Sequence, residues 1–151
     1  MEAANLLIIS DKKICELIKN SGYNSVFTEN YDFNISILKE KKINIILCSS
    51  NTPNFNIEEI SKKLSKKNKN IQLILFADEN DNNIKIEAMQ AGFYDVLPFS
   101  INQKLLQTYL DKALEKYFLI TDMKRYSKSL DQFVKERLIQ LKKITRSPEN
   151  I

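Results

Sequence analysis

The stretch Ile43–Cys48 reads INIILC, a short run in which all residues but one are apolar. Two other runs share this character, Asn5–Ser10 (NLLIIS) and Ile71–Phe76 (IQLILF). Short runs rich in isoleucine and leucine are typical of strands that are buried on both faces. Such strands occur in parallel sheets whose two faces are covered by helices, because each crossover connection places a helix on the sheet. The three runs therefore predict a parallel sheet in an α/β domain.

The segments between these runs have helical patterns. Helices are predicted at Lys12–Asn20, about Asp32–Lys41, Ile57–Lys66 and Asn83–Ala91, and two weaker strands at Ser25–Thr28 and Val96–Leu97. Gly22 and Gly92 follow two of the helices at positions where a left-handed C-cap is expected. Strands that alternate with helices predict a doubly wound sandwich with right-handed crossovers. The functional crevice of such a fold lies beyond the C-terminal ends of the strands.

Two segments resemble a known family. Ala88–Leu97 (AMQAGFYDVL) is similar to the segment that leads into the fifth strand of the CheY-like receiver domains of response regulators, and Asn44–Phe55 (NIILCSSNTPNF) is similar to their third strand and loop. The resemblance implies a flavodoxin-like fold for residues 1–118, with five parallel strands in the order 2-1-3-4-5. It also implies a role in two-component signal transduction.

The family's phosphoryl chemistry depends on residues that this chain replaces. It uses an aspartate nucleophile, an acidic pair that holds Mg²⁺, a Thr or Ser, and a Lys. The matching positions hold Ser49, the pair Ser10-Asp11, Ala77 and Phe99. An alignment that deletes two residues and keeps the family's Pro-Phe also leaves no lysine. We therefore predict a vestigial phosphorylation pocket with no catalytic residue, metal ion or cofactor, in which Phe99, at the position of the lysine, fills the space that water and phosphate otherwise occupy.

Alternatives for this crevice stay open. Ser49 offers a hydroxyl that could be modified or could bind a small ligand, although a loop that caps the strand ends is the simpler interpretation. Asp11 is either a metal ligand or the N-cap of the first helix. Asp78 and Glu79 follow another strand and could join Asp11 in an unconventional cation site.

Composition excludes several other functions. The chain has no histidine, which excludes a phosphohistidine relay or His-based catalysis within it. It has only two glycines, so no Gly-rich phosphate cradle supports a flavodoxin-like enzyme. No apolar run approaches the ~18 residues of a membrane span. The net charge is +4, and the lysine run Lys62–Lys69 has no aromatic interleaving, which is typical of a solvated helix end rather than of a nucleic-acid site. We predict a cytoplasmic, non-enzymatic protein without nucleic-acid or membrane partners.

The C-terminal part of the chain predicts one long helix. Gln103 to about Lys143 contains no Gly or Pro, and apolar residues recur there at spacings of three and four. This spacing is a heptad seam. A helix of ~40 residues is ~60 Å long, so residues 119–151 extend beyond what the domain can cover. We predict a parallel homodimer whose interface contains Met123, Tyr126, Leu130, Val134, Leu138 and Leu141.

Tyr126–Lys142 (YSKSLDQFVKERLIQLK) also resembles the helical linker that joins receivers to output domains. The leading hypothesis is a non-phosphorylatable pseudo-receiver that mediates protein–protein interaction and dimerisation in two-component signalling. It would contact signalling partners through its fourth helix, fifth strand and fifth helix. One alternative is an atypical receiver with altered ligand or phosphorylation chemistry in the crevice. The other is the regulatory front end of a longer protein with a cyclase, kinase or phosphohydrolase output.

Overall fold

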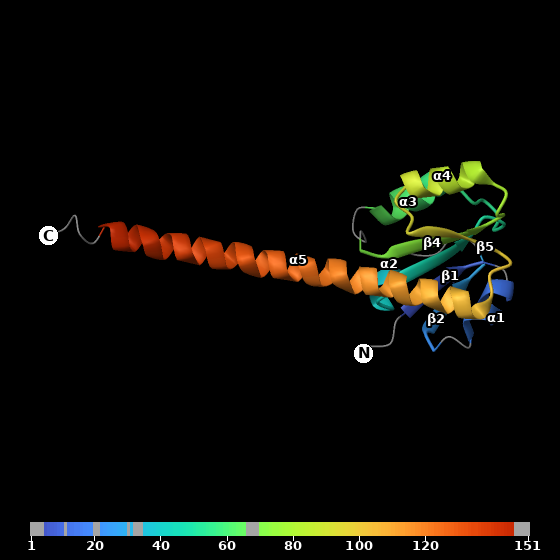
Figure 1. The fold of residues 1–151 in the computed structure, drawn as a ribbon, viewed down its shortest axis with the longest axis horizontal. Coiled ribbons are helices and arrows are strands. Elements are labelled where there is room, and N and C mark those ends of the chain that lie inside the picture. The colour runs from blue at the N-terminus through green and yellow to red at the C-terminus, as the bar shows by residue number, and fades with distance from the viewer. Residues whose placement is uncertain are drawn as a thin grey trace. The chain divides into compact units, whose positions relative to one another are not determined.

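A computed structural model describes residues 5–10, 12–19, 22–29, 31, 35–65 and 70–146 (Figure 1). The chain divides into two compact units, Met1–Tyr117 and Phe118–Ile151. The strands are β1 (Asn5–Ile9), β2 (Asn24–Thr28), β3 (Ile45–Ser49), β4 (Gln72–Ala77) and β5 (Asp95–Pro98). The helices are α1 (Lys12–Lys19), α2 (Ser36–Glu40), α3 (Ile57–Ser65), α4 (Asn82–Gln90) and α5 (Gln103–Arg146).

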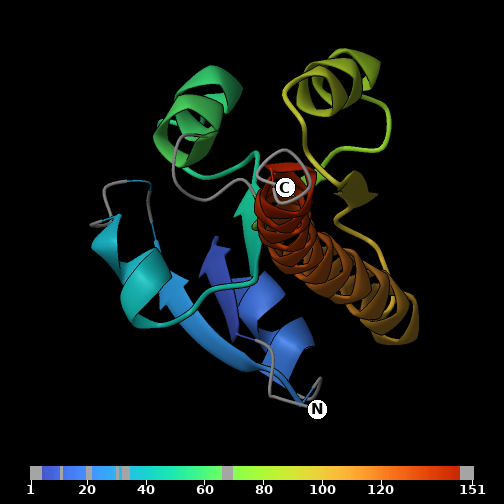
Figure 2. The same cartoon turned by 90° about the vertical axis from the view of Figure 1, so that its left-hand side faces the viewer.

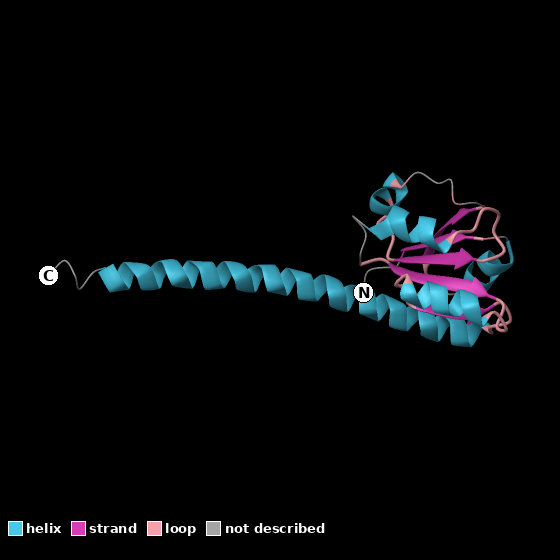
Figure 3. Cartoon of the chain, turned by 90° about the horizontal axis from the view of Figure 1, so that it is seen from above, coloured by secondary structure: helices cyan, strands magenta, loops and turns pink. Residues whose placement is uncertain are grey.

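The first unit contains one five-stranded sheet in the order β2-β1-β3-β4-β5. All strand pairs are parallel, and Figure 3 shows the strands side by side. The predicted fold class, a flavodoxin-like sheet in the order 2-1-3-4-5 with an extended C-terminal helix, is therefore confirmed. The register pairs Ile9 with Cys48 and Ser49 with Phe76. The C-terminal ends of β1, β3 and β4 consequently meet at one edge of the sheet.

Helices cover both faces of the sheet. Figure 2 shows α2, α3 and α4 on one side, and α1 with the first turns of α5 on the other. Successive residues of a strand point to opposite faces, so each central strand supplies apolar side chains to both layers. One layer is a buried cluster formed by Leu7, Ile9, Leu38, Ile43, Ile46, Cys48, Ile57, Ile60, Leu73, Leu75, Ala77, Ala88 and Phe93. The alternate strand residues Leu6, Ile8, Ile45, Leu47, Ile74 and Phe76 are also buried.

A glycine turn ends α4, as the sequence predicts. Gly92 has a φ of 93°, in the left-handed region that side chains disfavour. Its N–H donates to the carbonyl of Met89 over 3.2 Å, and the N–H of Phe93 donates to the carbonyl of Ala88 over 3.0 Å. This pair of bonds is the Schellman motif. It turns the chain so that Phe93 is buried, and the short strand β5 follows.

Some element boundaries differ from the prediction. The described part of the second helix is only Ser36–Glu40, and residues 32–34 lie outside the described part of the chain. The central strand β3 begins at Ile45 rather than Ile43. Asn44, just before it, pairs with Asn5 through both its backbone and its side chain: its N–H donates to the carbonyl of Asn5 over 2.9 Å, and its Oδ1 accepts the N–H of Asn5 over 2.9 Å. Helix α3 ends at Ser65, and residues 66–69 of the lysine run lie outside the described residues.

The second unit contains the rest of α5 as far as Arg146. All side chains from residue 122 to residue 142 are exposed. Within the described ranges, no helix combines the length and apolar character that crossing a membrane requires.

Candidate functional site at the strand ends

Two serines lie side by side where the central strands end. Ser10 follows β1 and Ser49 ends β3, and both are 1% exposed. The backbone N–H of Ser10 donates to the carbonyl of Thr28 over 3.2 Å, which joins the ends of β1 and β2. The N–H of Ser50 donates to the carbonyl of Phe76 over 2.9 Å and joins the ends of β3 and β4 in the same way. The predicted neighbourhood of Ser10 and Ser49 is thus present.

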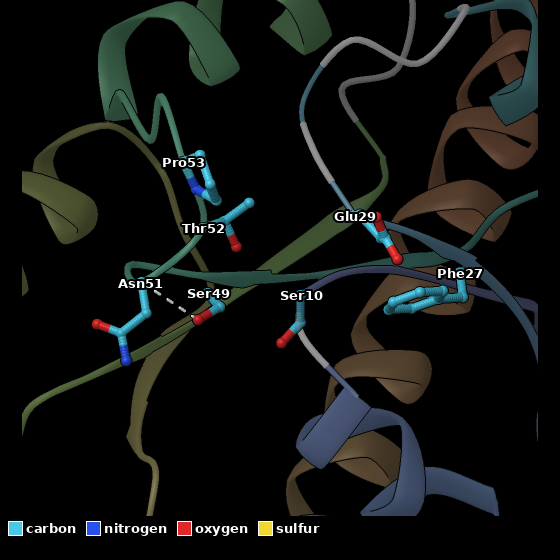
Figure 4. Close-up of a pocket in the computed structure, with 7 residues that line it drawn as sticks. All are labelled: Ser10, Phe27, Glu29, Ser49, Asn51, Thr52 and Pro53. Atoms are coloured by element: carbon cyan, nitrogen blue, oxygen red, sulfur yellow. Dashed lines mark hydrogen bonds between the residues drawn. The ribbon is translucent and has the colours of Figure 1, made fainter.

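The loop after β3 is held by polar groups of the site itself. The N–H of Asn51 donates to Oγ of Ser49 over 3.2 Å (Figure 4). The N–H of Thr52 donates to the carbonyl of Ser49 over 3.2 Å, and Oγ1 of Thr52 donates to the carbonyl of Ile9 over 3.4 Å. Ser49 therefore acts as a turn residue, because its hydroxyl oxygen accepts a backbone hydrogen bond from its own loop.

Tyr31 closes the site from the segment that follows β2. Its hydroxyl donates to the carbonyl of Ser49 over 3.1 Å, and its ring tilts against Phe55 with the ring centroids 6.0 Å apart. Burial raises the pKa of Tyr31 well above its usual value, so the phenol is neutral and donates. Nζ of Lys63 donates to the backbone carbonyl of Tyr31 over 2.8 Å and attaches this segment to α3.

A cavity of about 310 Å³ opens at this edge of the sheet. Its described lining residues come from the ends of β1, β2 and β3 and are Ser10, Phe27, Glu29, Ser49, Asn51, Thr52 and Pro53 (Figure 4). Phe27 and Glu29 are absent from the sequence-based prediction, which followed the apolar strands and the family motif. The signal that could have found them is their position at the end of the predicted strand Ser25–Thr28, since strand ends converge at the crevice.

Two other predicted pocket residues, Ala77 and Phe99, lie outside the described lining of the cavity. Ala77 is buried at the end of β4, in the core layer that faces α2, α3 and α4. Phe99 is 37% exposed, and its ring stacks on Phe76 with the centroids 6.4 Å apart. Its ring covers Phe76, and neither Phe99 nor Ala77 is among the cavity's described lining residues. Asp11 lies outside the described residues.

The described residues hold no acidic cluster that fits a metal ion. No group of three or more His, Cys, Asp and Glu residues that could bind a metal is found among them. Oδ1 of Asp78 accepts the N–H of Asn80 over 2.9 Å, and Oδ1 of Asp81 accepts the N–H of Ile84 over 3.1 Å as the N-cap of α4. Burial raises the pKa of Cys48 from 9.0 to about 12, so its thiol is not a nucleophilic thiolate at neutral pH.

The predicted dimer residues lie in the second unit. Met123, Tyr126, Leu130, Val134, Leu138 and Leu141 are all exposed, between 48% and 72% of their surface. Leu119 and Phe133 are exposed on the same stripe, and Ile139 is exposed on the opposite side of the helix, about 160° around the axis from Met123.

These features define the chain as a doubly wound α/β fold of the receiver type, with serines at the ends of two central strands. The chain is similar to a response regulator receiver domain protein from Clostridium thermocellum, with a TM-score of 0.68, 18% identity, and coverage of 78% of this chain and 98% of that one.

A CheY-like response regulator receiver domain protein from Methanospirillum hungatei JF-1 has a TM-score of 0.66, 14% identity and coverage of 77% and 97%. A response regulator from Thermotoga maritima has a TM-score of 0.66, 14% identity and coverage of 76% and 99%. No model of a known family and no curated protein matches the sequence. At these identities the likeness shows the fold alone.

Proposed function

We propose that this chain is a non-phosphorylatable receiver-like module that mediates protein–protein interaction and dimerisation in a two-component-type signalling system. Receiver domains are generally signalling modules without enzymatic activity of their own, and this chain has their fold. Its partners are other signalling proteins and a second copy of itself. We infer that it works in the cytoplasm, where two-component regulators act.

The observation that carries the proposal is the hydrogen bonding and burial of Ser49, which stands where receivers of the family have the phosphorylated aspartate. A serine hydroxyl is a weak nucleophile unless a base activates it. Here the hydroxyl oxygen accepts the Asn51 N–H, and the side chain is almost fully buried. Among the residues that the structure describes around the cavity, Glu29 is the only acid, and there is no lysine. We infer that the aspartate nucleophile, the Thr or Ser, and the Lys on which the family's phosphoryl chemistry depends are all replaced in this chain.

A small phosphodonor tests the first half of the proposal. The full chain is incubated with acetyl phosphate and Mg²⁺, and its intact mass is compared with that of Ser49→Ala. We expect no mass gain in either protein, because the described residues of the pocket place no carboxylate at the position of the phosphorylated aspartate. A gain of one phosphoryl group that is lost at alkaline pH would contradict the proposal. If the gain persists in Ser49→Ala, the acceptor is a different residue.

The exposed apolar stripe of α5 supports the dimerisation half. An apolar stripe with three- and four-residue spacing is stabilised when a second helix covers it. Exposed apolar residues from Met123 to Leu141 form this stripe over about five turns of the helix, at ~3.6 residues per turn. In a parallel pair, each position meets the same residue of the other copy, so apolar residues face apolar residues along the whole seam. Two copies of this chain can therefore cover each other's apolar stripe without a different partner.

A further inference from the structure

We infer that the cavity at the ends of β1, β2 and β3 binds a small organic cation, such as a primary alkylammonium group, between Glu29 and Phe27. This site is independent of the proposed dimerisation, since its described lining residues belong to the first unit. A pocket that binds a phosphoryl group prefers anions, whereas this site prefers cations.

The cavity is rich in hydrogen-bond acceptors. Oγ1 of Thr52 gives its proton to the carbonyl of Ile9, so lone pairs of that oxygen are left for a ligand. Oγ of Ser49 accepts one hydrogen bond and has a second lone pair. The carboxylate of Glu29 adds two acceptor oxygens and a negative charge. Figure 4 shows that the Asn51 side chain, which carries an amide donor, extends away from Glu29.

The charge of the lining disfavours anions. Glu29 is the single charged residue among the described lining residues, and it forms no ion pair with any residue that the structure describes. A phosphate or carboxylate could accept a hydrogen bond from the Ser49 hydroxyl, but the Glu29 carboxylate would repel it. An ammonium group instead has three donors that match acceptors on several sides.

The aromatic ring favours an organic cation over a metal ion. Phe27 is 40% exposed, and its ring lies on the same side of the cavity as Glu29 (Figure 4). A ring face attracts an alkylammonium by cation–π interaction, while the carboxylate forms a charge-assisted hydrogen bond with it. Mg²⁺ prefers carboxylate oxygens and water in octahedral geometry, and among the described lining residues Glu29 is the only carboxylate.

The size of the cavity limits the ligand to a small molecule. At about 310 Å³ it is at the lower end of the range for small-molecule sites. A short chain such as n-butylammonium fits this range. A macromolecular partner is too large to enter it.

The test is an amide NMR titration of the full chain at constant ionic strength. Three probes of equal chain length are used: n-butylammonium, neutral 1-butanol and anionic butyrate. We expect saturable shifts at the amides of Ser10, Asn51 and Thr52 with n-butylammonium, at millimolar affinity, and little response to butyrate. Equal responses to butyrate and n-butylammonium would overturn the inference, as would shifts that do not saturate.

Two variants assign the contacts. Glu29→Gln should weaken n-butylammonium binding on the order of tenfold, because it removes the charge and keeps the shape. Glu58→Gln is the matched control, since Glu58 is an exposed glutamate on α3 outside the cavity lining, and it should bind like the original chain. Phe27→Leu should weaken the binding of tetramethylammonium several-fold. Unchanged affinity in Glu29→Gln would overturn the inference. So would saturation of the same amides by Mg²⁺ alone at lower concentration than n-butylammonium.

Discussion

The hydroxyl of Tyr31 donates a hydrogen bond to the carbonyl oxygen of Ser49 over 3.1 Å. This bond joins the segment after β2 to the end of β3, although β1 lies between these two strands in the sheet. Lys63 holds the same segment through the carbonyl of Tyr31. The loop after β3, which carries the candidate site, is therefore held by the segment after β2, and that segment is held in turn by α3. The geometry of the loop depends on Tyr31.

We predict that Tyr31→Phe lowers the free energy of unfolding by about 1 kcal/mol, the typical net value of one hydrogen bond. The loss arises because the Ser49 carbonyl is left without this donor while the aromatic contact with Phe55 is kept. Urea unfolding at neutral pH measures the change. Tyr109→Phe is the control, because Tyr109 lies on α5 within the first unit, outside the predicted dimer seam, and should leave the midpoint nearly unchanged. Equal midpoints for the two variants would show that the bond does not contribute.

Stability should fall at alkaline pH through Cys48. Its pKa is raised from 9.0 to about 12 by burial, so the folded state keeps a proton that the unfolded state has lost. When the unfolded state binds fewer protons, the free energy of unfolding decreases as the pH rises. The contribution is fully present below pH 9.0 and is lost progressively as the pH approaches 12.

Urea unfolding at several pH values between about 8.0 and about 11 tests this dependence. This range begins near the ordinary pKa of a thiol and extends above it. Cys48→Ala should reduce the alkaline loss of stability, whatever its effect at neutral pH. Cys15→Ala is the matched control, because Cys15 is only partly buried. A pH dependence that is the same in both variants would assign the alkaline effect to other groups, among them Tyr31, whose pKa burial also raises.

Dimerisation should depend on one side of α5. We expect Leu138→Gln to weaken self-association by roughly tenfold or more, because it removes an apolar side chain from the predicted seam. Its neighbour Ile139 is equally exposed and lies on the opposite side of the helix, so Ile139→Gln should leave the association constant unchanged. Sedimentation equilibrium measures both variants. Equal effects, or a monomeric original chain, would contradict the proposed seam.

Salt should strengthen this dimer rather than weaken it. Between Phe118 and Lys142 the helix carries six basic and three acidic residues. In a parallel pair these excess positive charges lie near their copies, and their repulsion is screened as the ionic strength increases. The association constant should therefore rise between about 0.05 M and about 0.5 M NaCl. Lys128→Glu should reduce the salt effect. A dimer that dissociates with salt would instead indicate ion pairs between the helices.

The sheet and its order could be predicted because its signals are local. The runs that become β1, β3 and β4 are almost wholly apolar, and Gly92 marks the turn before β5. The extent of α2 could not be predicted, since the apolar spacing of Ile35, Ile37 and Leu38 does not show where a helix begins. In the structure Leu38 is buried and Ile35 is exposed.

The site could be predicted only in part. Ser10 and Ser49 were found because they follow strongly apolar strands. Glu29 and Phe27 were missed because β2 is an edge strand with few apolar residues, and its end carries no family motif. The sequence predicts that Phe99 fills the pocket, but in the structure the Phe99 ring stacks on Phe76. A local sequence pattern does not show contacts between residues that are far apart in the chain.

The strand order also has a consequence for how the protein is made. β1 pairs first with β2, then β3 joins the other side of β1, and β4 and β5 are added in turn beyond β3. No strand has to be inserted between two strands that are already paired. A chain that leaves the ribosome from its N-terminus can therefore extend the sheet in the order of translation, and each new strand finds an open edge next to the strand before it or next to β1.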